Sequence, residues 1–296
     1  MRKFLVIVTV VLLLLAGGAW WLTMPARVTA SDYAALIGVP ARGATVFHAG
    51  GCASCHSAEG AIEDARLILS GGRAFASDFG TFHAPNISQD NDHGIGSWEV
   101  TDLANAMING TSPQGQHYYP AFPYTAYSRA TPQDIADLYA YMITLPADAT
   151  PDLPHDLAFP FTLRRGLGLW KALYLTDAWQ ITGDLTEAEQ RGRYLAEALG
   201  HCAECHTPRG PLGALDRNRW MAGAPNPSGR GTIPNITPAK LDWSESDLIA
   251  YFTSGFTPDY DTAGGSMAAV VTSLAQLPQT DRAALAAYLK RLPPID

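Results

Sequence analysis

The chain has 296 residues, of which 47% are hydrophobic and 16% are charged, and its formal net charge is −8. This length fits about two domains, and the composition is that of a packed protein, which excludes a disordered one. The acidic balance argues against nucleic acid as a partner and favours a basic patch on another protein.

The N-terminal segment, residues 1–30, differs in composition from the rest of the chain. Arg2 and Lys3 precede an uncharged stretch, 4–22, which as a helix would span roughly 28 Å, close to the hydrocarbon thickness of a bilayer. The stretch is longer than the apolar core of a typical secretory signal, although Val-Thr-Ala at 28–30 could serve as a cleavage site. The sequence therefore predicts an uncleaved transmembrane helix, with a cleaved signal peptide as the alternative.

One five-residue pattern occurs twice, as Cys-Ala-Ser-Cys-His at 52–56 and as Cys-Ala-Glu-Cys-His at 202–206. Cys-x-x-Cys-His is the attachment signature of c-type haem, in which both thiols bind the porphyrin and the adjacent imidazole binds iron. A thioredoxin-like pair does not require the histidine, and a zinc site would need further ligands at suitable spacing. The pattern therefore predicts two covalently bound haem c groups, with these residues as attachment points and proximal ligands: Cys52, Cys55, His56, Cys202, Cys205 and His206.

The sequence after each motif is also repeated. Ala-Pro-Asn-Ile-Ser at 84–88 matches Ile-Pro-Asn-Ile-Thr at 233–237, and further on Gly110 pairs with Gly255. A repeat of about 100 residues implies two copies of one domain rather than a solenoid. We therefore divide the chain into the N-terminal segment 1–30, a first domain 31–146, a linker 147–185 and a second domain 186–296.

Each copy has helical patterning, and no stretch alternates convincingly with a period of two residues. A helix is predicted at 186–199, leading into the second motif. Ser97 and Ser244 are the predicted N-caps of short helices that end at Gly110 and Gly255. Last helices are predicted at 131–145 and 278–292. The fold class is therefore all-α, with two tandem helical domains after a transmembrane helix.

The linker contains several prolines and an apolar segment, 167–175. It is too apolar for a flexible tether, which would be rich in Gly and Ser. We expect it to pack across both domains or to rest on the membrane.

The second iron has a candidate for its sixth ligand. Met267 stands in Gly-Gly-Ser-Met-Ala at 264–268, twelve residues after Gly255. A loop of small residues, outside a helix, can bring the thioether over the haem face. The alternative is that Met267 fills core space, as Met often does. The sequence therefore predicts Met267 as the distal ligand, which would raise the potential of that haem.

The first domain differs at this position. Twelve residues after Gly110 stands Phe122, which cannot ligate iron. Met107 and Met142 lie at apolar helical positions, where core packing is the stronger interpretation. His117, five residues before Phe122, is the leading candidate for the sixth ligand. A surface histidine beside a turn and an open iron are the alternatives.

The surroundings of the motifs suggest further roles. Pro208 follows the second motif where the first has Ala58. A carbonyl near such a proline commonly orients the proximal histidine through its other ring nitrogen, so we expect the first haem to use a different acceptor. Three arginines are candidates for pairing with haem propionates, the alternative being ordinary surface residues: Arg73, Arg209 and Arg230.

Four strings carry a family resemblance. They are Phe-Gly-Thr-Phe-His-Ala-Pro-Asn-Ile at 79–87, Tyr-Pro-Ala-Phe-Pro-Tyr at 119–124, Pro-His-Asp-Leu at 154–157 and Gly-His-Cys-Ala-Glu-Cys-His-Thr-Pro-Arg-Gly at 200–210. Together they resemble the cytochrome c subunits of membrane-bound bacterial alcohol, aldehyde and sugar dehydrogenases. The resemblance implies tandem cytochrome c domains. Many of those subunits carry three haems and have Met where Phe122 stands, so their first-haem ligand is not carried over.

The resemblance implies electron transfer. A periplasmic dehydrogenase subunit would reduce one haem, and a quinone, an oxidase or a small cytochrome would accept the electron from the other. The protein would be held at the periplasmic face of the bacterial inner membrane by its N-terminal helix. The alternative is a di-haem enzyme of the peroxidase or thiosulfate dehydrogenase type, with an open or unusual first haem.

Overall fold

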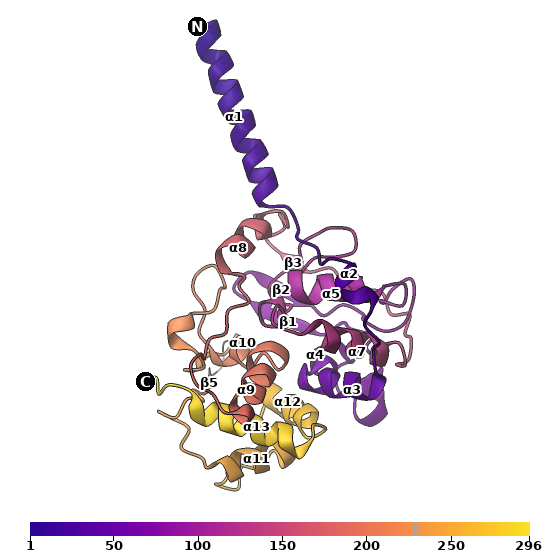
Figure 1. Ribbon diagram of the computed structural model, residues 1–296, viewed down its shortest axis with the longest axis vertical. Coiled ribbons are helices and arrows are strands. Elements are labelled where there is room, and N and C mark those ends of the chain that lie inside the picture. The colour runs from indigo at the N-terminus through magenta and orange to yellow at the C-terminus, as the bar shows by residue number, and fades with distance from the viewer. Residues whose placement is uncertain (228, 230) are drawn as a thin grey trace.

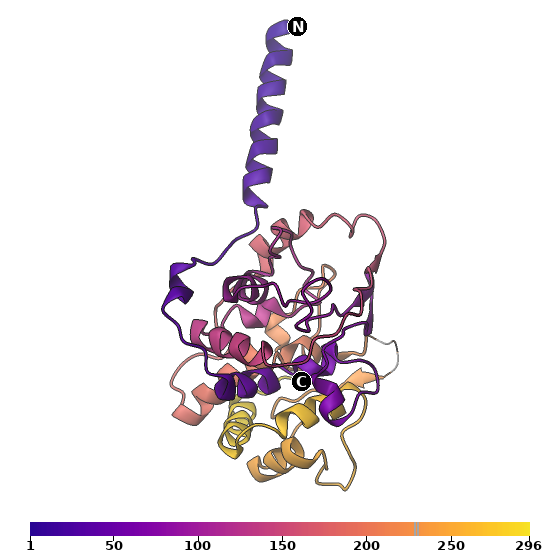
Figure 2. The same cartoon turned by 90° about the vertical axis from the view of Figure 1, so that its right-hand side faces the viewer.

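The computed structural model describes residues 1–227, 229 and 231–296 and consists of one long helix projecting from a rounded body (Figures 1 and 2). The projecting helix is α1 (Arg2–Leu22), and none of its residues is buried. Among the described residues, it alone is long and apolar enough to cross a membrane, with a mean hydropathy of 2.5.

The body is mostly helical. The helices of its first part, in chain order, are α2 (Ser31–Ala34), α3 (Pro40–Ala49), α4 (Cys52–His56), the 3₁₀ helix η1 (Glu63–Leu67), α5 (Val100–Asn109), α6 (Tyr124–Tyr127) and α7 (Pro132–Met142). The later helices are α8 (Gly166–Tyr174), α9 (Glu187–Arg193), the π-helix η2 (Tyr194–Leu199), α10 (Ala203–His206), the 3₁₀ helix η3 (Arg217–Arg219), α11 (Glu245–Ser254), α12 (Ser266–Leu274) and α13 (Gln279–Arg291). The predicted helical fold class is confirmed.

Short strands add to the helices. Three of them, β1 (Ala74–Ser77), β2 (Gly80–His83) and β3 (Asp156–Leu157), form one antiparallel sheet, and β4 (Ala224–Pro225) pairs with β5 (Thr232–Ile233). Sequence patterning missed them because two to four residues are too few to display a period of two. Since β3 comes from the linker and pairs with β2, this part of the linker belongs structurally to the first domain.

The same kind of helix crossing occurs once in each domain. In the first, α3 packs on α7, and a Cβ added at Gly43 would lie 1.9 Å from the carbonyl oxygen of Asp137. In the second, α9 packs on α13, and a Cβ at Gly192 would lie 1.9 Å from the carbonyl oxygen of Ala284. A side chain at either glycine would therefore force the helices apart. This close crossing fixes the helix that leads into each Cys-x-x-Cys-His motif.

Local signals account for the ends of α5 and α11. Gly110 and Gly255 adopt left-handed conformations, with φ of 55° and 79°, and end α5 and α11 as predicted. Ser244 caps α11 as predicted, but the prediction of Ser97 as the cap of α5 was wrong. Glu99 takes that place instead, because its side chain accepts a hydrogen bond from the backbone of Asp102.

Each domain also packs against the region that precedes or contains the other's motif. Helix α6 of the first domain contacts η2 of the second, and α12 of the second contacts α3 and α4 of the first. The C-terminal helices α11, α12 and α13 lie at the end of the body opposite α1 (Figure 1). These contacts bring the two Cys-x-x-Cys-His motifs close together where the domains meet.

Candidate haem sites

Each motif occupies one short helical turn. Helix α4 carries the first motif, and α10 carries most of the second, with Cys202 as its N-cap. The residue before each first cysteine has a left-handed backbone: φ is 59° at Gly51 and 40° at His201. This turn brings the chain sharply out of the preceding helix. It places two thiols and an imidazole close together, as attachment of one porphyrin requires.

The two motif histidines have equivalent hydrogen-bond partners. Nδ1 of His56 donates to the carbonyl oxygen of Pro85 at 2.8 Å, and Nδ1 of His206 donates to that of Pro234, also at 2.8 Å. Each bond leaves Nε2 of the ring for a metal and fixes the plane of the ring. The expectation of an acceptor near Pro208, and of a different one in the first domain, was wrong, because both acceptors come from the repeated Pro-Asn-Ile segment.

Glycines hold these segments in place. The N–H of Gly71 donates to the carbonyl of His56 at 2.7 Å, and the N–H of Gly223 donates to that of His206 at 2.8 Å. Both glycines have positive φ, and a Cβ at Gly71 would lie 2.5 Å from the carbonyl carbon of Pro85. A side chain there would displace the acceptor of the histidine, so the positions call for glycine.

The electrostatics of the motifs argue against a reactive pair of redox cysteines. Burial raises the pKa of Cys52 and of Cys202 to about 12, so neither thiol is a thiolate at neutral pH. A reactive cysteine pair would instead have a lowered pKa. Burial lowers the pKa of both His56 and His206, which keeps the imidazoles neutral and able to bind iron.

A metal held by protein side chains alone does not fit the described residues. Outside positions 228 and 230, no three His, Cys, Asp or Glu side chains are grouped so as to hold a metal ion. A zinc site of the usual four ligands is therefore not formed there. The donor set at each motif, two thiols and one oriented imidazole, fits covalent haem, which supplies an iron couple that exchanges one electron.

The two motifs lie next to each other. Nε2 of His201 donates to the carbonyl oxygen of Gly50 at 3.2 Å, and its ring packs edge-on against Tyr127, with centroids 5.7 Å apart. Tyr127 itself donates to the same Gly50 oxygen at 3.4 Å. A Cβ at Gly200 would lie 3.5 Å from the carbonyl oxygen of Ala49. The backbones that introduce the two motifs are therefore in contact.

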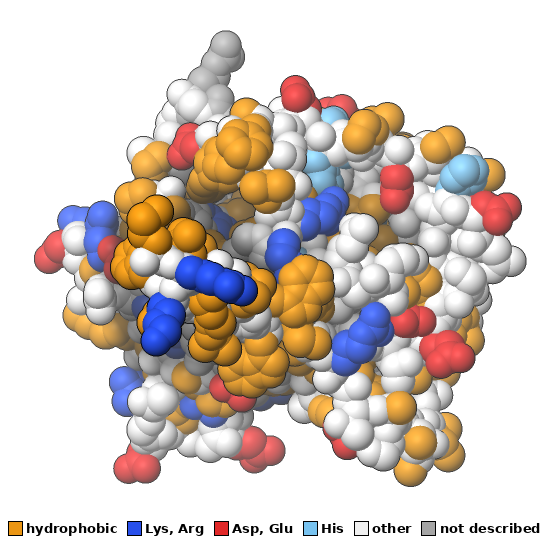
Figure 3. All heavy atoms as spheres, turned by 90° about the horizontal axis from the view of Figure 1, so that it is seen from above, with side chains coloured by type: hydrophobic (Ala, Val, Ile, Leu, Met, Phe, Trp, Pro, Cys, Tyr) orange, Lys and Arg blue, Asp and Glu red, His pale blue; other side chains and the backbone are white. Residues whose placement is uncertain are grey.

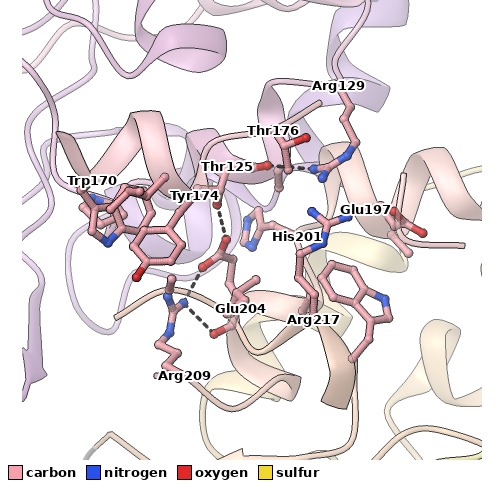
Figure 4. A pocket seen from close by; sticks show the side chains of 18 residues that line it. Thr125, Arg129, Trp170, Tyr174, Thr176, Glu197, His201, Glu204, Arg209 and Arg217 are labelled. Atoms are coloured by element: carbon pink, nitrogen blue, oxygen red, sulfur yellow. Dashed lines mark hydrogen bonds and ion pairs between the residues drawn. The ribbon is translucent and has the colours of Figure 1, made fainter. Parts of the chain in front are cut away.

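A cleft of about 180 Å³ lies beside this contact (Figure 4). Its walls come from the first domain, the linker and the second domain. Thr125 donates to Oε1 of Glu204 at 2.6 Å, and Arg209 forms an ion pair with the same carboxylate. Because Glu204 lies inside the second motif, its hydrogen bond from Thr125 ties the motif to α6 of the first domain.

The arginines named as propionate partners have different surroundings. Arg73 donates to the carbonyl oxygen of Ser54, inside the first motif, at 2.5 Å. Arg209 is engaged with Glu204 and with the carbonyl of Gly213. Arg230 lies outside the described residues. Arg73 therefore keeps a position beside the first haem site, whereas Arg209 is already paired.

Met267 lies in a helix, contrary to the predicted loop. Gly265, with φ of 55°, precedes α12, and Met267 is the second residue of that helix and is half-buried. Three small residues, Gly264–Ser266 in the sequence, still provide the turn that starts the helix. Helix α12 packs on α11 and reaches across to α4. The assignment of Met267 as the distal ligand of the second iron stays a prediction.

His117 lies in a polar contact at the end of α1. Nε2 of its buried ring donates to the carbonyl oxygen of Thr23 at 2.9 Å, and Nδ1 accepts from Nζ of Lys171 at 3.0 Å. Iron ligation would require the ring to give up one of these bonds. Phe122 packs instead between Tyr118 and Tyr127, with ring centroids 6.0 Å and 5.7 Å away. The ring contact with Tyr127 brings Phe122 close to the loop that precedes the first motif.

Comparison with known proteins agrees with this arrangement. A family model for cytochrome c matches the chain twice, at residues 40–146 and 189–293. The chain belongs to the cytochrome c family. Each matched segment contains one Cys-x-x-Cys-His motif, so this cytochrome c has two haem c groups, both bound covalently.

Several curated proteins are similar to this cytochrome c. A "Diheme cytochrome c-type" protein of Cereibacter sphaeroides is 59% identical over 93% of both chains. The fructose dehydrogenase cytochrome subunit of Gluconobacter japonicus is 38% identical over 85% of this chain and 52% of its own length. The gluconate 2-dehydrogenase cytochrome c subunit of Pantoea cypripedii is 34% identical over 85% of this chain and 59% of its own. The cytochrome thus spans little more than half of these two dehydrogenase subunits.

Sequence reasoning missed three features of the cytochrome sites. They are the carbonyls of Pro85 and Pro234, the glycines that hold them, and the contact between His201 and Gly50. The first two could have been found, because Gly71 and Gly223 precede the repeated segment by a similar distance in both copies. The third could not, since 151 residues separate its partners.

Proposed function

We propose that this di-haem cytochrome c carries electrons from a periplasmic dehydrogenase subunit to the respiratory chain. Its relatives include cytochrome subunits of fructose and gluconate dehydrogenases, which supports a dehydrogenase as the donor. A quinone, an oxidase or a small cytochrome is the acceptor. The protein supplies fixed haem positions, exclusion of water and axial ligands that set the potentials.

One observation carries the proposal: the contact between His201 and Gly50 joins the two attachment loops. Each motif would attach its haem directly beside these loops, so their contact would hold the two attachment points close together. Bound in this way, the two haems could exchange electrons without an added carrier.

We assign His56 and His206 as proximal ligands, because each ring has one nitrogen held by a backbone carbonyl. Met267 is assigned to the distal side of the second iron. At the position that corresponds to Met267, the first domain has Phe122, which offers no thioether to the first iron. Since a Met ligand raises the potential, the first haem is the lower in potential and receives electrons from the donor.

The N-terminal helix anchors this assembly in the bacterial inner membrane, with the two domains on the periplasmic face. Support comes from the length and apolarity of α1 and from the basic residues Arg2 and Lys3 at its start. An anchored carrier stays beside membrane-bound donors and acceptors.

The proposal is tested with the full-length protein purified from membranes together with its donor. Addition of the substrate of the co-purified dehydrogenase should reduce both haems, and addition of a soluble quinone or of membranes should reoxidise them. A stopped-flow trace should show the first haem reduced before the second. Haems that stay oxidised with every dehydrogenase substrate tested would exclude the carrier function.

A second function, a di-haem enzyme, is favoured by one observation. Both ring nitrogens of His117 are engaged with Thr23 and Lys171, and Phe122 offers no ligand, so neither side chain would close the sixth position of the first iron. Carbon monoxide and cyanide distinguish the two functions. Rapid binding at the first haem, together with turnover of peroxide or thiosulfate, would support the enzyme, whereas binding without turnover would leave the carrier.

A further inference from the structure

The linker helix α8 is fastened to the end of α1. A Cβ at Gly168 would lie 2.6 Å from the carbonyl oxygen of Thr23, so the two backbones are in direct contact. Arg165 donates to the carbonyl of Trp20 at 2.7 Å and to Oγ1 of Thr23 at 3.0 Å. Its guanidinium also lies 4.2 Å from the centroid of the Trp20 ring. The position of α8 relative to α1 is therefore fixed by several independent contacts.

Helix α8 has two different faces. On the inner face, Gly168 and Lys171 are buried, and Nζ of Lys171 donates to the carbonyls of Asn109 and Gly110 at 2.6 and 2.7 Å. On the outer face, Leu169 and Leu173 are 49% and 64% exposed, and Leu173 also lines the cleft beside the second motif. These two leucines are four residues apart and so lie on the same side of the helix. A helix on a water-exposed surface would carry polar residues there.

The loop before α8 continues the apolar surface. It exposes three further hydrophobic side chains, and we call the whole set the apolar platform: Phe159, Phe161, Leu163, Leu169 and Leu173. Viewed from the end where α1 emerges, hydrophobic side chains cover that helix and parts of the surface beside it (Figure 3). Contiguous apolar patches are uncommon on soluble monomers and mark a contact with a partner or a membrane.

The position of α1 indicates that a lipid bilayer is the partner of the apolar platform. Its 21 residues span roughly 31 Å as a helix, which matches the hydrocarbon layer of a bilayer. Trp20 and Trp21, 66% and 74% exposed, stand at the end where interfacial aromatics belong. The same end touches α8 through Arg165 and Gly168, so the headgroup region meets the linker at this level. The charged group of Arg165 can face the headgroups while leucines enter the acyl region.

We propose that the apolar platform rests in the outer leaflet of the bilayer and forms a second membrane contact beside α1. This inference depends on the anchoring role of α1 given above. Two contacts would prevent the body from swinging freely on a single helix. They would hold the two haem domains at one height and orientation above the lipid.

The test uses full-length holoprotein in nanodiscs of phosphatidylethanolamine and phosphatidylglycerol. A photoreactive p-benzoylphenylalanine replaces Leu169 in one variant, Leu13 of α1 in a second, and Tyr260 in a third. Tyr260 is 95% exposed and belongs to the second domain, between α11 and α12, the end of the body opposite α1. All three positions are exposed, and unchanged haem absorption verifies that each variant is folded.

Lipid adducts detected by mass spectrometry are expected at positions 13 and 169 and not at 260. An adduct at 13 without one at 169 overturns the platform but leaves the anchor intact. Loss of the adduct at 13 contradicts the anchor in the proposed function, whatever happens at 169. Equal labelling at 260 and 169 would also overturn the platform, because it would show contact without specificity.

Discussion

The side chain of His201, which introduces the second haem motif, donates a hydrogen bond to the carbonyl of Gly50, which introduces the first. The backbone of His201 is left-handed, with φ of 40°, a conformation that costs energy for a side-chain-bearing residue. The surrounding contacts with Gly50 and Tyr127 offset this cost. The junction between the two haem loops is therefore built from one strained residue and its partners.

Replacing this histidine should loosen the junction. His201→Gly suits the positive φ but loses the hydrogen bond and the contact with Tyr127, and we expect a net loss of about 1 kcal/mol of unfolding free energy. Electron exchange between the haems, followed after flash reduction, should slow. His201→Asn, which tolerates the same backbone and keeps an N–H donor, is the matched control and should lie closer to the parent protein. Unchanged exchange in His201→Gly would show that the junction has no part in electron transfer.

A thioether introduced in the first domain should change that haem alone. Phe122→Met places the ligand type of the second domain at the equivalent position. We expect the potential of the first haem to rise by on the order of 0.1 V and its affinity for carbon monoxide to fall. Redox titration and ligand-binding spectra measure both effects, with Phe122→Leu as the control for lost aromatic packing. If Phe122→Met behaves like Phe122→Leu, residue 122 does not face the iron.

Removal of the His117 ring distinguishes a role in iron ligation from a role in stabilising the fold. Because its two nitrogens bond to Thr23 and Lys171, His117→Ala should leave the spectrum and the potential of the first haem unchanged. The variant should instead lose about 1–2 kcal/mol of unfolding free energy, since Lys171 loses an acceptor in a buried place. A high-spin shift of the first haem in low-temperature EPR would contradict this and support His117 as the sixth ligand.

The helix crossings should not tolerate a methyl group. Gly43→Ala and Gly192→Ala each force a Cβ into a backbone carbonyl, and we expect each to cost about 3 kcal/mol in denaturant unfolding. Gly166→Ala is the control, because nothing lies within 4 Å of its added Cβ. Equal stability of Gly43→Ala and Gly166→Ala would mean that α3 and α7 are not held at this distance.

Low pH should destabilise the first domain by protonating the carboxylate of Asp137. Burial acts to raise the pKa of this carboxyl, but hydrogen bonds from Arg42, the N–H of Val39 and Gln133 outweigh it and hold the pKa below its ordinary value. The stabilisation is thus present above the unfolded pKa of about 4 and is lost as the pH falls through the lower folded value. Asp137→Asn should cost about 2 kcal/mol at neutral pH and flatten the acid limb of the stability curve. Asp78→Asn, which replaces an exposed carboxylate, is the control for the loss of one negative charge.

Sequence reasoning was most successful where the signal is local. The paired Cys-x-x-Cys-His motifs led to two haem c groups, and Gly110 and Gly255 end their helices where predicted. It failed where geometry depends on distant segments. Thr23 is 94 residues from His117, and Gly50 is 151 residues from His201, so no spacing rule connects either pair. Ser97 is of the residue type that usually caps a helix, yet α5 begins after Glu99, whose side chain forms a capping box with Asp102.

The packing of α6 against η2 and of α12 against α4 makes each domain part of the support of the other. Buried residues of both domains belong to one hydrophobic cluster. Cutting the chain within the linker would therefore expose apolar surface on each half, and the separated halves should reassociate or aggregate rather than behave as independent proteins with one haem each.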